Sequence, residues 1–231
     1  MKYENILKKL KSMPNPEAVK GMAQYGINPT NNLGISVSTL RPIAKEIGKD
    51  HNLALKLWSS GIHDARLLAC FIEDPVKVTS EQMDSWAKDF DSWDVCDQAC
   101  TSLFDLTPLA WTKIFEWAKR DEEFVKRAAF SIIAGLAVHD KKAGDKEFEQ
   151  FSPLIKKHSV DERNYVKKAV NWALRNIGKR NLALNKQMIK FSKEIQKIDS
   201  KSARWIANDA IRELSSEKVQ NRLVEKEKKG K

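Results

Sequence analysis

One kind of amphipathic segment recurs along this chain at intervals of about 40 residues. The strings VKRAAFSIIAGL at 125–136, VKKAVNWALRNI at 166–177 and ARWIANDAIREL at 203–214 align without gaps, at offsets of 41 and 37 residues. Apolar residues recur three and four positions apart in each string, which is the spacing of one helix face. A chain built from such units buries its apolar faces between successive copies, so its helices stack in a row.

The remainder of the sequence also favours helix. Only 9 of the 231 residues are Gly and 7 are Pro. Proline and polar clusters separate helix-sized segments of about 10–18 residues, and none has the alternating pattern of a strand. A period of about 40 residues with two helices per unit is the signature of HEAT and armadillo arrays. We therefore predict an all-α fold, a HEAT-like helical repeat solenoid (α-α superhelix) with a basic concave face.

The predicted domain is a single one over residues 1–223. The lysine-rich segment 224–231 is predicted to be a disordered tail, because it offers little apolar surface to bury.

The charge balance indicates an anionic partner. The chain has 41 Lys and Arg against 31 Asp and Glu, a net charge of +10. The concave face of a helical stack suits a cylindrical polyanion such as duplex DNA. On charge alone, a soluble basic protein without such a partner remains an alternative.

Several classes of protein are disfavoured. No apolar run reaches the length of a signal peptide or of a bilayer span, about 18 residues. The odd set Cys70, Cys96 and Cys100 has no Cys-x-x-Cys pair, which favours buried thiols in a reducing compartment. Phosphate-loop and dinucleotide motifs are missing from the sequence, and the histidines lack zinc-ligand spacing. We expect a cytoplasmic protein without a membrane segment, a metal or another cofactor.

The string SWDVCD at 92–97 places Trp93 and Asp97 four positions apart, on one helix face. An indole can exclude water and pack against a sugar, and a carboxylate can stabilise a developing cation or orient a water molecule. The alternative is that Trp93 belongs to the core and an aspartate caps the helix.

Two further clusters could bind phosphate. Arg127 follows a helix start and could contact a phosphate or pair with Asp97, or it could simply be solvated. Lys168, Trp172 and Arg175 share one helix face, where two cations flank an apolar plate. The alternative there is a core tryptophan between solvated neighbours.

Together these strings resemble the AlkD-like DNA alkylation repair family of HEAT-like repeat DNA glycosylases. The resemblance spans most of the chain, from near residue 15 to near residue 215, and departs from the family at Ser92, Cys96 and Cys100. It is carried by SWDVCD at 92–97, FVKRAAF at 124–130, YVKKAVNWALR at 165–175, MAQYG at 22–26, and NNLGIS at 31–36 with Arg41.

The resemblance implies a monofunctional glycosylase that excises cationic purines, of the N3- and N7-methyl type, from double-stranded DNA. It implies that Asp97 stabilises the sugar oxocarbenium and positions water, and that Trp93 and Trp172 flank the deoxyribose. The implied or predicted DNA-binding residues are Tyr25, Arg127, Lys168 and Arg175. A monomer fits the search for single lesions.

Two other functions remain open. A non-catalytic DNA-binding scaffold on the same fold would bind in a salt-dependent way and release no base. A protein-interaction solenoid would present an apolar groove and bind without regard to salt.

Overall fold

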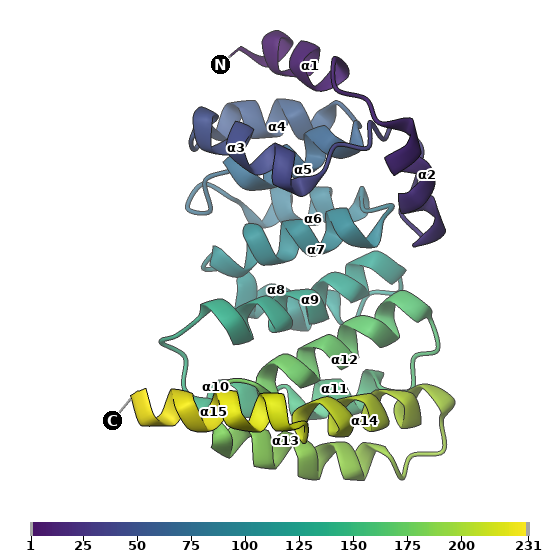
Figure 1. Ribbon diagram of the computed structural model, residues 1–231, viewed down its shortest axis with the longest axis vertical. Helices are drawn as coiled ribbons and strands as arrows, with labels where there is room; N and C mark the ends of the chain where they lie inside the picture. The colour runs from purple at the N-terminus through teal and green to yellow at the C-terminus, as the bar shows by residue number, and fades with distance from the viewer. Residues whose placement is uncertain (1, 230–231) are drawn as a thin grey trace. The chain divides into compact units, whose positions relative to one another are not determined.

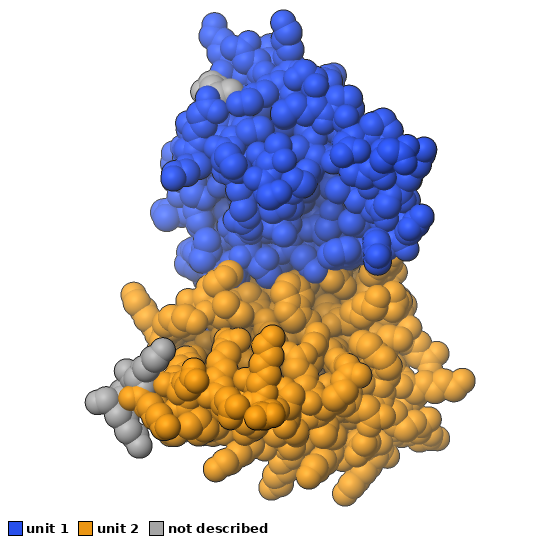
Figure 2. Space-filling view, in the orientation of Figure 1, with its two compact units in different colours: residues 1–111 blue, residues 112–231 orange. Residues whose placement is uncertain are grey.

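The computed structural model describes residues 2–229, which are helices and their connections with no strand among them (Figure 1). The prediction of an all-α fold is confirmed. The chain divides into two compact units, residues 1–111 and 112–231 (Figure 2). That residues 1–223 act as a single domain stays a prediction.

Unit 1 is organised round α5, which packs against α3, α4 and α7. Short polar side chains begin several of its helices, as Ser36 does when its Oγ accepts a hydrogen bond from the Thr39 amide at 3.2 Å. The helices are α1 (Tyr3–Lys11), α2 (Pro16–Gln24), α3 (Val37–Ile47), α4 (His51–Ser59), α5 (His63–Ile72), α6 (Ser80–Lys88), α7 (Trp93–Ser102) and the 3-10 helix η1 (Phe104–Leu106).

Unit 2 is organised round α12, which packs against α9, α13 and α14 (Figure 1). Helix α8 (Ala110–Trp117) contains the boundary between the units. The helices that follow are α9 (Glu123–His139), α10 (Asp145–Glu149), α11 (Ser152–His158), α12 (Asn164–Gly178), α13 (Leu182–Ile195), α14 (Lys201–Leu214) and α15 (Glu217–Lys229).

The three aligned strings form α9, α12 and α14, and hydrogen bonds join each copy to the next. Asn176 Nδ2 donates to the Ala134 carbonyl at 3.0 Å, and Asn171 Nδ2 donates to the Ile206 carbonyl at 3.1 Å. Both asparagines are buried. Because buried amides must find partners, these bonds fix the register of neighbouring copies.

The predicted disordered tail is wrong for residues 224–229, which continue α15. Leu223 is buried, and Lys226 Nζ donates to the Arg180 carbonyl at 2.6 Å. The burial of Leu223 and this hydrogen bond dock a helix whose overall composition is lysine-rich. Residues 230–231 lie outside the described residues.

The described part of the chain, residues 2–229, contains no helix that combines the length and the apolarity needed to cross a membrane. Cys70, Cys96 and Cys100 are buried, as the sequence predicts. Burial raises the pKa of the Cys70 and Cys100 thiols above the ordinary value.

Candidate nucleic-acid interface

The predicted site residues of unit 1 lie together at the start of α7. Trp93 and Asp97 are both half-buried and stand one helical turn apart. The Trp93 indole Nε1 donates a hydrogen bond to the Tyr25 carbonyl at 2.9 Å, and Tyr25 is 77% exposed. Trp93 is therefore not a fully buried core residue, and Tyr25, Trp93 and Asp97 gather on one part of unit 1.

The loop between α2 and α3 is tied to the beginning of α7. Ser92 is the N-cap of α7, yet its side chain makes no capping bond. Its Oγ instead accepts a hydrogen bond from the Asn28 amide at 2.7 Å, and Asn28 Nδ2 donates to Asp91 at 2.9 Å. These bonds hold the loop that follows Tyr25 against the turn that presents Trp93.

An ion pair between the buried His63 and the half-buried Asp94 supports the same turn. His63 Nε2 lies 2.8 Å from Asp94 Oδ2, and the adjacent Asp64 carboxylate accepts the amides of Leu33 at 2.6 Å and Ile35 at 2.7 Å. Burial lowers the pKa of His63, but the hydrogen bond and the negative charge of Asp94 outweigh it, so the pKa lies above the ordinary 6.5. This network was not predicted from the sequence, because His63 and Asp94 lie 31 positions apart and meet only when the helices pack.

In unit 2, Arg127 is buried on α9 and is 5% exposed. Its Nη1 donates to the Tyr165 carbonyl at 2.7 Å, which joins α9 to the first turn of α12. The alternative of a solvated Arg127 is therefore wrong. A contact of Arg127 with phosphate or with Asp97 stays a prediction.

The α12 face contains Lys168, Trp172 and Arg175, as the spacing predicts. Lys168 is exposed, and the other two are half-buried. Arg175 forms an ion pair with Glu213 of α14, and its Nε lies 3.6 Å from Asp209 Oδ2. Two carboxylates thus offset the charge predicted to contact phosphate, and that contact stays a prediction.

The Glu213 carboxylate also accepts a hydrogen bond from Lys179 Nζ at 2.7 Å. Burial alone would raise the pKa of Glu213, but the Lys179 hydrogen bond and the Arg175 charge lower it below the ordinary value. Glu213 is therefore ionised at neutral pH and holds both cations. The pairing was not predicted from the sequence, because Glu213 lies 38 residues after Arg175.

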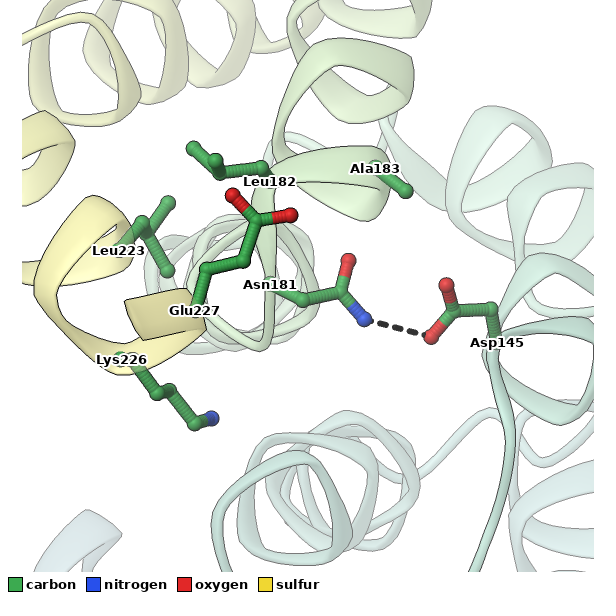
Figure 3. A pocket seen from close by; sticks show the side chains of 7 residues that line it. All are labelled: Asp145, Asn181, Leu182, Ala183, Leu223, Lys226 and Glu227. Atoms are coloured by element: carbon green, nitrogen blue, oxygen red, sulfur yellow. Dashed lines mark hydrogen bonds between the residues drawn. The ribbon is translucent and has the colours of Figure 1, made fainter. Parts of the chain in front are cut away.

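Two cavities of the described residues are lined by other side chains. Unit 2 contains a cavity of about 360 Å³, in which Asn181 Nδ2 donates to Asp145 Oδ1 at 2.7 Å (Figure 3). Unit 1 contains one of about 420 Å³ beside the stacked rings of Trp58 and Trp86. No predicted site residue lines either cavity.

Comparison with known proteins identifies the relatives. Uncharacterized proteins of Listeria monocytogenes and Listeria innocua are 24% and 23% identical to this chain over 136 residues, which are 57% of this chain. The match covers 61% of the length of each of these relatives.

A solved structure shares the fold. It is described as "A new family of proteins related to the HEAT-like repeat DNA glycosylases with affinity for branched DNA structures". It matches with a TM-score of 0.77 at 18% identity, over 92% of this chain and 95% of that chain. The HEAT-like helical architecture is confirmed. A family model described as "DNA alkylation repair enzyme" matches residues 6–214, almost the whole chain, and the protein therefore belongs to this family.

Proposed function

We propose that this protein is a DNA glycosylase that excises cationic alkylated purines from duplex DNA and acts as a monomer. The observation that carries the proposal is the pairing of Trp93 with Asp97 one turn apart at the start of α7, neither of them fully buried. A carboxylate beside an indole suits a reaction in which positive charge moves onto a sugar.

The reaction needs little activation of the leaving group, because the alkylated base is already charged. An N3- or N7-alkylated purine carries a positive charge, and it leaves as a neutral base when the bond from C1′ to nitrogen breaks and the electron pair goes to the base. The sugar becomes an oxocarbenium ion, to which water adds at C1′ with loss of a proton. The products are a free base and an abasic site.

Asp97 would stabilise that oxocarbenium and orient the water. Asp97 is half-buried, and partial shielding from solvent strengthens the attraction of a carboxylate to a cation. The Trp93 ring, restrained by its bond to Tyr25, would pack against the deoxyribose. In unit 2, Lys168 would neutralise a phosphate, and the half-buried Trp172 would offer a second apolar surface.

The test compares two Asp→Asn variants of the same helix. Asp97→Asn should lower the release of methylated purine from methylated duplex DNA by at least about 100-fold, with unchanged DNA affinity. Asp94→Asn should lower the thermal midpoint, because Asp94 pairs with His63, and should lower the rate of release far less than Asp97→Asn does. Release at the normal rate by Asp97→Asn would refute the assigned chemistry.

A second candidate is a DNA-binding scaffold without catalysis. The solved structure of the same fold is described as belonging to proteins with affinity for branched DNA structures. Such a scaffold would bind DNA in a strongly salt-dependent manner, would prefer branched over linear duplex, and would release no base. Binding and excision measured on the same DNA separate the two candidates.

A further inference from the structure

Trp205 is an exposed tryptophan on α14 of unit 2. Its side chain is 41% exposed, whereas Trp58, Trp86 and Trp117 are at most 3% exposed. The core-facing residues of the same helix, such as Ile206 and Ala210, are fully buried. Since the helix already has an apolar face to bury, the exposed indole is a surface available to a ligand.

The repeat places Trp205 where the two preceding copies have a cation. In the three aligned strings, the third residue is Arg127 in α9, Lys168 in α12 and Trp205 in α14. Arg127 and Lys168 are the cations that the sequence predicts to bind DNA. Trp205 therefore substitutes an aromatic ring for a cation at the same repeat position.

Cations surround the indole. Lys167 Nζ lies 5.2 Å from the centre of the Trp205 ring, and Lys168 and Lys201 are exposed nearby on α12 and α14. Among the described residues, these three lysines form no ion pair with a carboxylate. The acidic side chains that α14 directs toward α12 are already occupied by Arg175, Lys179 and Arg212. The charge next to Trp205 is therefore available to an anion.

Hydrogen bonds before and after Trp205 hold its helix in place. Ser202 Oγ donates to the Asp161 carbonyl at 2.7 Å, and Asn171 Nδ2 donates to the carbonyl of Ile206 at 3.1 Å. The first turns of α14 are thus fixed to the preceding repeat. A side chain on a fixed helix loses less conformational freedom on binding than one on a mobile segment.

We propose that Trp205 and Lys167 form a stacking site for an unpaired nucleotide of DNA. The base stacks on the indole, and Lys167 neutralises its phosphate. Paired bases already stack on their neighbours inside a duplex, so a lone indole flanked by lysines suits a strand whose base faces are free. The site would accept any base, because each has a π face. This inference rests on the proposed function only in taking DNA as the ligand.

The experiment uses the full chain and fluorescence anisotropy with two DNAs, a blunt duplex and the same duplex with a single-stranded tail of about six nucleotides. The wild-type protein should bind the tailed DNA more tightly. Trp205→Ala should weaken binding of the tailed DNA about 10-fold and leave the blunt duplex unaffected, while Trp205→Phe should retain most of the tail preference. Lys167→Gln should reduce the salt slope on the tailed DNA by about 1.

Matched controls remove a similar surface group elsewhere in unit 2. Val138→Ala truncates an apolar side chain of α9 that is 45% exposed, and Lys218→Gln removes an exposed charge of α15. Both should bind the two DNAs like the wild type, and circular dichroism should show that every variant is folded.

The stacking site is overturned if Trp205→Ala binds tailed DNA like the wild type or weakens both DNAs equally. Release of methylated purine by the wild type would then leave the glycosylase proposal intact. Conversely, a wild type that prefers the tail through Trp205 but releases no base supports the stacking site and removes the glycosylase. Failure of the wild type to bind either DNA would overturn both.

Discussion

His158 should make unit 2 sensitive to mild acid. It ends α11, is 9% exposed, and packs edge-on against the Phe130 ring with centroids 5.5 Å apart. Burial, together with the positive charges of Lys126 and Lys157, lowers the pKa of His158 from 6.5 to about 4. The unfolded chain therefore takes up a proton below pH 6.5, while the folded chain stays neutral down to about pH 4.

The sign of the effect follows from this difference. The contribution of His158 to stability is complete above its unfolded pKa and is lost as the pH falls toward the folded value. At about pH 5, the two pKa values correspond to a loss of about 2 kcal/mol in the free energy of unfolding. Allowing for solvent screening at the exposed part of the ring, we expect about 1.5 kcal/mol.

Urea unfolding followed by circular dichroism measures this loss. The wild type and His158→Gln are compared at about pH 7.5 and about pH 5, because glutamine does not titrate. The wild type should lose about 1.5 kcal/mol more than the variant on acidification. Equal losses in the two proteins, or a larger loss in the variant, would refute the reasoning.

Three other changes have definite expected outcomes. The pKa of His63 is raised in the folded chain, so its contribution to stability is complete below pH 6.5 and is lost as the pH rises through the folded pKa. In His63→Gln, the thermal midpoint should therefore fall less than in the wild type as the pH rises above neutral. Gly34→Ala should destabilise the chain by about 2–4 kcal/mol in urea unfolding, because its φ is 74° and a Cβ there would meet the Asn15 carbonyl oxygen at 2.4 Å. Gly21→Ala, within α2 and with open space around it, should instead stabilise by about 0.5–1 kcal/mol. The same sign for both glycines would contradict this account of local strain.

Features encoded within one helix could be predicted from the sequence. The three aligned strings correspond to α9, α12 and α14, because apolar spacing directly reflects helix geometry. The shared face of Trp93 and Asp97 was predictable for the same reason, since a separation of four residues fixes their relation on a helix.

Features that depend on packing between distant segments could not be predicted. Arg175 was predicted to be a phosphate contact, but the approach of α14 to α12 brings Glu213 to it. The bond from Trp93 to the Tyr25 carbonyl joins residues 68 positions apart. The helical part of the predicted tail was missed because the docking of Leu223 is a tertiary event that composition does not reveal.

We propose that the surface carrying Trp93 and Asp97 breaks the glycosidic bond of a cationic purine. Single-turnover incubation of excess wild-type protein with duplex DNA containing one 7-methylguanine, followed by quantification of free base, tests it directly. The account predicts release of 7-methylguanine and an abasic site far faster than spontaneous loss in the same buffer. DNA that is fully bound yet loses the base only at the spontaneous rate would contradict it.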